Sequence, residues 1–112
     1  MKKRDRTSLG DILEAAERIL DYTRGRVKAD IEADKMIQDA VVRRFEIIGE
    51  AAKRLSVELK KNHPALDWAA MAGMRDVLIH EYDVVDIDIV WDTLNSEVPK
   101  IIEYLRGILH DG

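Results

Sequence analysis

Apolar residues recur every three or four positions along residues 30–61. The stripe is made of Ile37, Ala40, Val41, Phe45, Ile48, Ala52, Leu55 and Leu59. This spacing puts the apolar side chains on one face of an α-helix, and the proline in the "NHP" that follows disfavours further helix. We therefore predict a single helix from about Asp30 to Lys61, long enough to span the whole molecule.

Helical spacing also marks the N-terminal segment and the segment that follows residue 67. Ser8 precedes an apolar run and is placed to cap a first helix, which Gly25 can end. A shorter helical region is expected from Trp68 to about Glu81, with an interruption at Gly73.

The last helix is predicted over about residues 88–109. Its apolar residues keep helical phase across Pro99, so we predict one helix with a kink at the proline. The stretch "YDVVDIDIV" comes closest to strand alternation, but its aspartates are more typical of a loop that leads into a helix cap. These four helical elements predict an all-α protein, a single domain over residues 1–112, folded as an antiparallel four-helix bundle.

Composition limits the functions that are open to the chain. Its 112 residues include no cysteine, which excludes disulfide and thiolate chemistry and fits a reducing, cytoplasmic setting. Charged residues interrupt the apolar run after the basic N-terminus, so no signal peptide or membrane span is expected. A net charge of −4 argues against a broad nucleic-acid-coating surface but allows a small basic cleft. A chain of this size is close to the point at which a dimer partner helps.

The common enzyme signatures are absent. The sequence has no G-x-x-x-x-G-K-[ST], G-x-G-x-x-G, H-E-x-x-H or G-x-S-x-G motif. Its histidines, His63, His80 and His110, lie far apart, so we predict neither a metal site nor a cofactor. Trp68 and Trp91 are most simply interpreted as core or interface anchors.

The stretch "MRDVLIHEYD" places an arginine and a histidine inside an apolar run. On an ideal helix Arg75 and His80 would be separated by about 140°, whereas Asp76 and His80 would share a face. One chain alone therefore makes a poor Arg/His site, but a two-fold dimer could bring Arg75 of one chain to His80 of the other. Spacing alone favours a purely structural explanation, because such pairs also arise by chance.

A paired arginine and histidine suit metal-free phosphodiester cleavage. A histidine of near-neutral pKa can take or give a proton, and an arginine can bind phosphate oxygens through two hydrogen bonds. RNA supplies its own nucleophile, the 2′-hydroxyl, so no cysteine, metal or triad is needed. Asp76 would orient the imidazole of His80 and favour its protonated form.

The same stretch resembles a known family signature. "GMRDVLIHEY" is similar to the HEPN superfamily motif, and more closely to the HepT form R-x-x-x-x-H-x-Y, matched here by Arg75, His80 and Tyr82. Four further stretches resemble that family in order and spacing, together covering most of residues 5 to 105. They are "DILEAAERILDYT", "DAVVRRFEIIGEAAKRLS", "HPALDWAAMAGMRDVLIHEY" and "VDIDIVWDTLNSEVPKII".

The resemblance implies a specific function. Similar proteins are homodimeric helical bundles that act as metal-independent endoribonuclease toxins, paired with a minimal nucleotidyltransferase antitoxin. It implies that Arg75 and His80 are catalytic, that Asp76 supports them, and that the RNA product ends in a 2′,3′-cyclic phosphate. It also implies that the antitoxin silences the toxin by transferring AMP onto Tyr82. A hetero-oligomer with the antitoxin is left open, as is a second hypothesis, a non-catalytic partner or substrate-binding module of the transferase.

Two residues of the long predicted helix have other expected roles. A glycine in mid-helix costs about 1 kcal/mol relative to alanine, so Gly49 is expected where another helix approaches closely. Arg44 falls within the apolar stripe, where it would either pair across an interface or reach a bound phosphate.

Overall fold

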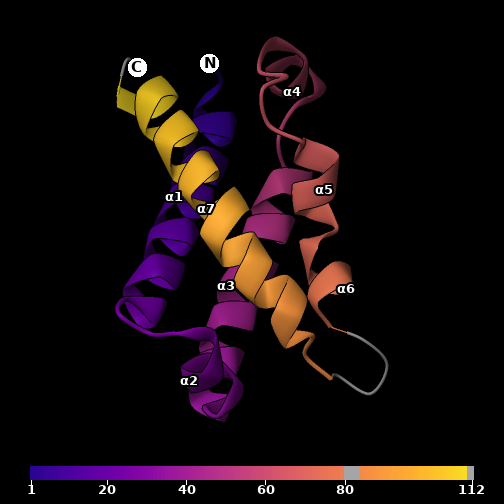
Figure 1. The fold of residues 1–112 in the computed structure, drawn as a ribbon. Coiled ribbons are helices and arrows are strands. Elements are labelled where there is room, and N and C mark those ends of the chain that lie inside the picture. The colour runs from indigo at the N-terminus through magenta and orange to yellow at the C-terminus, as the bar shows by residue number, and fades with distance from the viewer. Residues whose placement is uncertain (80–83, 111–112) are drawn as a thin grey trace.

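The computed structural model describes residues 1–79 and 84–110, which fold into an elongated set of helices (Figure 1). Three long helices dominate the described part of the chain: α1 (Lys3–Thr23), α3 (Lys35–Lys53) and α7 (Ile87–His110). Four short helices lie between them: α2 (Lys28–Glu32), α4 (Val57–Asn62), α5 (Trp68–Ala72) and α6 (Met74–Leu78). The described residues contain no strand, so the predicted all-α class is confirmed.

The chain runs back and forth along the long axis of the molecule. In Figure 1, α1 descends, α3 ascends, α5 and α6 descend together, and α7 ascends, so both termini lie at the same end. Helix α3 packs against α1 on one side and against α5 and α6 on another, and α7 packs against α1, α2 and α6. The third antiparallel segment, α5 with α6, is therefore made of two five-residue helices instead of one long helix. A four-helix bundle and a homodimer stay predictions.

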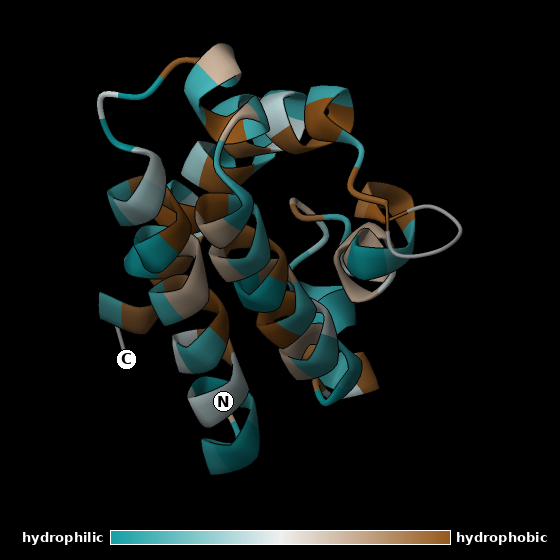
Figure 2. Ribbon diagram, turned by 90° about the horizontal axis from the view of Figure 1, so that it is seen from below, coloured by the Kyte–Doolittle hydropathy of each residue, from teal (hydrophilic) through white to brown (hydrophobic). Residues whose placement is uncertain are grey.

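Apolar side chains from the three long helices form the core. Apolar and polar stripes alternate along these helices in Figure 2. Nine of the fully or almost fully buried side chains show how each long helix contributes: Leu9, Ile12 and Ile19; Val41, Phe45 and Ile48; Val98, Ile101 and Leu105. Within the described ranges, no helix is both long enough and apolar enough to cross a membrane.

The predicted single helix over residues 30–61 is wrong, because the helix is interrupted twice, between α2 and α3 and between α3 and α4. Asp34 begins α3, where its carboxylate accepts a hydrogen bond from the Ile37 amide at 3.1 Å. Ser56 begins α4, where its hydroxyl accepts one from the Leu59 amide at 3.1 Å. Such caps accept hydrogen bonds from the first amides of a helix, so a new helix can begin there at a small cost in free energy. The apolar spacing continues across both breaks and so conceals them.

The first helix begins earlier than predicted. Ser8 is buried inside α1, which starts at Lys3, so it is not a cap. Gly25 lies just beyond the end of α1 with a φ of 72°, a conformation that glycine adopts without strain, as predicted for the end of this helix. Helix α7 continues without interruption through Pro99, which confirms one last helix; the kink stays a prediction.

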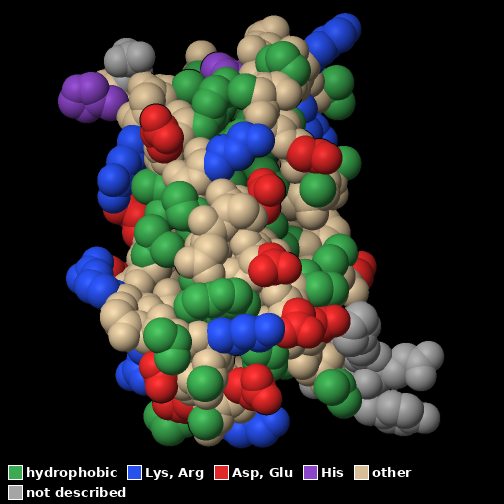
Figure 3. All heavy atoms as spheres, in the orientation of Figure 1, with side chains coloured by type: hydrophobic (Ala, Val, Ile, Leu, Met, Phe, Trp, Pro, Cys, Tyr) green, Lys and Arg blue, Asp and Glu red, His purple; other side chains and the backbone are tan. Residues whose placement is uncertain are grey.

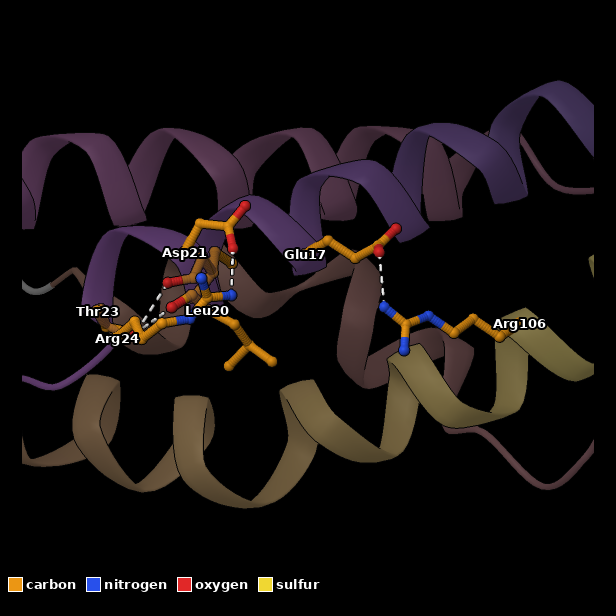
Figure 4. A network of polar contacts seen from close by, with 7 residues as sticks. Glu17, Leu20, Asp21, Thr23, Arg24 and Arg106 are labelled. Atoms are coloured by element: carbon orange, nitrogen blue, oxygen red, sulfur yellow. Dashed lines mark hydrogen bonds and ion pairs between the residues drawn. The ribbon is translucent and has the colours of Figure 1, made fainter.

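Ion pairs on the surface join neighbouring helices. Figure 3 shows positive and negative side chains interspersed over the face that it presents. Glu17 of α1 and Arg106 of α7 lie 2.7 Å apart, and Asp21 pairs with Arg24 at the end of α1, also at 2.7 Å (Figure 4). Exposed pairs of this kind each contribute about 0 to 1 kcal/mol, so packing and not charge holds α7 on α1.

A buried carboxylate ties the start of α1 to the turn between α3 and α4. Asp5 is 3% exposed and accepts hydrogen bonds from the Ser56 amide at 2.9 Å and the Ser56 hydroxyl at 2.6 Å. Burial alone would raise the pKa of Asp5, but these two hydrogen bonds and nearby Lys2 and Arg4 lower it below its usual value. The charged form therefore stabilises the fold.

This contact predicts a pH dependence of stability. Because the folded pKa of Asp5 is lowered, its contribution is present above the ordinary carboxyl pKa of about 4 and is lost as pH falls through the folded value. Between pH 7 and about pH 3, the unfolding free energy of Asp5→Asn should therefore fall less than that of the wild type. Urea unfolding at each pH measures this, with the exposed Asp39→Asn as the control. Parallel curves for Asp5→Asn and wild type would contradict the prediction.

Candidate functional site

Helix α6 carries the first two residues of the predicted site. Its ends, Met74 and Leu78, are buried, while Arg75, Asp76 and Val77 between them are exposed. The two apolar residues lie four apart and so anchor one face of this short helix on the core. Arg75 and Asp76 are thereby presented on the opposite, solvent-facing side.

Glu46 of α3 orients the side chain of Arg75. The Arg75 Nε lies 3.3 Å from the Glu46 Oε1, and the Arg75 side chain remains 47% exposed. The other oxygen of Glu46 lies 3.9 Å from Arg43 Nη1, so one carboxylate contacts two arginines. The guanidinium of Arg75 is thus directed by a contact from a core helix and remains accessible at the surface.

The chain is closed on itself just after α6. Ile79 leaves the helix with extended backbone angles, φ −119° and ψ 122°, and pairs with Val85 in an isolated antiparallel bridge. The Asp86 amide donates a hydrogen bond to the Leu78 carbonyl at 2.8 Å. Residues 79 and 85 therefore lie side by side. The predicted site residues His80 and Tyr82 fall between them, outside the described residues.

The predicted helix to about Glu81 is wrong at its end, because α6 stops at Leu78. The angular relations expected for an ideal helix, with Asp76 and His80 on one face, therefore lose their basis. Asp76 itself is exposed and its amide donates a hydrogen bond to the Gly73 carbonyl at 3.1 Å. Its supporting role stays a prediction.

The start of α7 agrees with the sequence interpretation. The Asp86 carboxylate accepts a hydrogen bond from the Ile89 amide at 3.1 Å, as expected of an aspartate at a helix cap. Together with the backbone bond from Asp86 to Leu78, this cap fixes the return of the chain beside α6.

Gly49 lies where the end of α5 closely approaches α3. A Cβ at this position would come within 3.2 Å of the Ala72 carbonyl oxygen and 3.3 Å of the Met71 carbonyl oxygen. The predicted close helix approach is confirmed. Because α5 leads directly into α6, this contact also sets the position of the helix that carries Arg75.

Two glycine substitutions should therefore have opposite effects. Gly10 is also helical, but a Cβ there would meet nothing within 4 Å, so Gly10→Ala should stabilise the protein by up to about 1 kcal/mol. Gly49→Ala should lose this gain and lower the unfolding free energy, since two backbone carbonyls must move. Urea unfolding of the two variants side by side measures the difference. A Gly49→Ala variant as stabilised as Gly10→Ala would contradict this interpretation.

Sequence reasoning missed a contact made by His63. Its Nδ1 lies 2.8 Å from the Tyr104 hydroxyl, and its carbonyl accepts a hydrogen bond from the Trp68 indole at 2.8 Å. These bonds join the end of α4 to α5 and α7. Trp68 is 6% exposed, which confirms it as a core anchor. Nothing in the local sequence around His63 pointed to this role.

Both predicted roles of Arg44, pairing across an interface or reaching a bound phosphate, stay predictions. It is partly buried on α3, and its Nε is buried without a hydrogen-bond partner among the described residues. Among all the residues that the structure describes, no group of three or more His, Asp or Glu side chains could hold a metal ion.

The fold and the motif define a class of protein: an all-α chain that presents an exposed arginine on a short helix, just before a backbone bridge between Ile79 and Val85. Residues 12–108 match the family model described as ribonuclease HepT-like. The chain belongs to this HepT-like family, within the HEPN superfamily, as the resemblance in the sequence indicated.

Curated relatives agree with this assignment. A protein of Thermococcus cleftensis named "Probable ribonuclease HepT" is 43% identical over 101 residues, which are 90% of this chain and 92% of that protein. One of Caldanaerobacter subterraneus, named "Putative RNase", is 38% identical and covered over 96% of both chains. A Methanocaldococcus jannaschii protein named "Gamma-glutamylcyclotransferase and putative RNase" is 38% identical, and this chain spans 50% of its length. No solved structure matches.

Proposed function

We propose that this protein is a metal-independent endoribonuclease in which Arg75 and His80 act on RNA. The observation that carries the proposal is the placement of Arg75: exposed on α6, oriented by Glu46, and five residues before the motif histidine. The family and the names of its relatives support ribonuclease as the class of activity.

The reaction needs only groups of the RNA and of the protein. The 2′-hydroxyl attacks the adjacent phosphorus, the bond from phosphorus to the 5′-oxygen breaks, and a 2′,3′-cyclic phosphate remains. His80 takes up the proton of the 2′-hydroxyl and delivers a proton to the leaving 5′-oxygen. Arg75 binds the non-bridging oxygens, where negative charge grows in the transition state. Asp76 supports the imidazolium by its charge.

The site is proposed to be composite, with Arg75 of one chain beside His80 of a second copy. Apolar exposure next to Arg75 supports a homodimer of this kind: Val77 is 54% exposed on α6 and Val84 is 58% exposed beside the bridge to Ile79. Covering such side chains favours association.

As part of the same proposal, the protein is a toxin whose partner is a minimal nucleotidyltransferase antitoxin. The Tyr82 hydroxyl attacks the α-phosphate of ATP and pyrophosphate leaves, so AMP is joined to the tyrosine. The added group brings bulk and negative charge to a site that binds a phosphate.

The Tyr82 step predicts a mass change. Incubation with the cognate transferase and ATP should add one or more AMP units to the wild type, while Tyr82→Phe should add none. Tyr104→Phe is the control, because that tyrosine lies on α7 and bonds His63. Intact-mass spectrometry reads all three. Equal modification of Tyr82→Phe and wild type would exclude Tyr82 as the acceptor.

The proposed activity is tested by incubating the purified protein with total RNA in excess EDTA. Cleavage, with cyclic phosphate at the new 3′ ends, would support the proposal. Absence of cleavage by a protein whose mass shows no modification would favour the other hypothesis, a non-catalytic binding module of the transferase. The net charge of −4 is the observation that favours this alternative.

A further inference from the structure

An open depression between α3, α4, α5 and α7 gathers positive charge. It has a volume of about 760 Å³ and is lined by Lys53 of α3, Lys60 of α4 and Lys100 of α7. These three lysines belong to three different helices, and the fold brings them to one hollow. We call this hollow the lysine depression.

The charge of the lysine depression differs from that of the whole chain. Its lining includes three lysines and one acidic residue, Asp67, among the described residues. The Asp67 carboxylate is engaged in capping α5, where it accepts a hydrogen bond from the Ala70 amide at 2.9 Å. Lys53 also contacts Glu50 at 3.5 Å, but both side chains are more than half exposed. A chain of net charge −4 thus keeps a locally positive hollow.

The lysine depression lies on the side of α3 that also holds Arg75. Glu46, Gly49 and Lys53 follow one another at three- and four-residue spacing, so they share one face of α3. Glu46 contacts Arg75 and Gly49 contacts the end of α5, while Lys53 lines the depression. Glu46 and Lys53 are seven positions apart, which is about 10 Å along the helix axis. Figure 1 shows α4, α5 and α6 following one another down this side.

The lining favours phosphate over base recognition. Ammonium groups bind phosphates as point charges, without reading sequence. The aromatic ring in the lining, that of Trp68, is buried and its indole N–H is bonded to the His63 carbonyl. It therefore does not offer a face on which a base could stack.

We propose that the lysine depression binds backbone phosphates of the single RNA strand whose scissile phosphate lies at Arg75. This rests on the proposed function, which it extends by adding a second binding surface for the substrate. Lys53, Lys60 and Lys100 hold the strand to one side of the cleavage point and increase affinity independently of sequence.

The test compares two triple variants of equal net charge. Lys53→Gln/Lys60→Gln/Lys100→Gln removes the lysines of the depression. Lys3→Gln/Lys35→Gln/Lys61→Gln removes three lysines outside it, including the direct neighbour of Lys60 on α4. The probe is a fluorescent single-stranded RNA with 2′-O-methyl groups, which lacks the nucleophile and therefore cannot be cleaved. Its dissociation constant is measured at several salt concentrations.

The depression variant should bind the probe about tenfold or more weakly, and the slope of log Kd against log[salt] should decrease by up to about 2, near 0.7 for each lost phosphate contact. The control variant should bind as the wild type does. Equal losses in both variants, no loss in either, or no binding by wild type would overturn the proposal.

Cleavage of unmodified RNA in EDTA by the same preparations separates the two proposals. Wild type of unmodified mass that binds through the three lysines but does not cleave would refute the ribonuclease and leave the binding surface. Wild type that cleaves, with both triple variants binding equally, would refute the binding surface and leave the ribonuclease.

Discussion

Arg75→Ala and His80→Ala are each expected to reduce RNA cleavage in EDTA by at least about 100-fold. Loss of a general acid–base group costs about 10² to 10⁴, and loss of one group that stabilises the transition-state charge costs about 10² to 10³. Initial rates on a defined RNA measure the effect. The unfolding curve of Arg75→Ala should stay close to that of the wild type, because Arg75 is about half exposed and its pair with Glu46 is worth little to stability.

Arg43→Ala is the matched control for Arg75→Ala. Both arginines contact Glu46, at 3.9 Å and 3.3 Å, but only Arg75 belongs to the motif. Arg43→Ala should therefore keep most of the activity. Arg75→Lys should recover only part of it, since lysine keeps the charge but lacks the planar fork. The catalytic reading fails if Arg75→Ala and Arg43→Ala cleave equally fast, or if wild type and both motif variants are equally toxic in cells.

Phe45→Ala should cause the largest loss of stability, about 3 to 5 kcal/mol in unfolding free energy. Phe45 is the one phenylalanine of the chain and is fully buried in the middle of α3, the helix that contacts α1, α5 and α6. Truncation would leave a cavity in the core cluster to which Phe45 belongs. A small domain has only about 5 to 15 kcal/mol to lose. Chemical denaturation followed by circular dichroism measures the difference.

Met36→Ala provides the reference on the same helix. Met36 is 82% exposed, so its truncation should change the unfolding free energy by no more than about 0.5 kcal/mol. If Phe45→Ala lowered the unfolding free energy no more than Met36→Ala does, the packing of Phe45 would not stabilise the core as its burial indicates.

Apolar periodicity predicted where helices lie better than where they end. The stripe of residues 30–61 contains the buried residues Val41, Phe45 and Ile48, as expected. The breaks at Asp34 and Ser56 were missed because each uses a polar residue already compatible with the pattern. Their hydrogen bonds to Ile37 and Leu59 became visible only in the structure.

The candidate site was located by its motif, and its geometry was not. The helical composition of "MRDVLIHEYD" suggested a helix through Glu81, but α6 ends at Leu78, and the next residue, Ile79, pairs with Val85 six positions further along the chain. Glu46 could not be assigned to Arg75 from the sequence, because the packing of α6 on α3 creates that pair. The lysine depression has the same origin, since three helices supply its charges.

The bridge between Ile79 and Val85 brings two parts of the chain together through backbone atoms. Among the described residues, this contact and the hydrogen bond from the Asp86 amide to the Leu78 carbonyl use no side chain. Under the proposed function, one codon change at Arg75, whose side chain is about half exposed, would disarm a gene copy whose product still reaches its native form. Genomes should then retain inactive copies of such a gene whose products still fold into stable proteins.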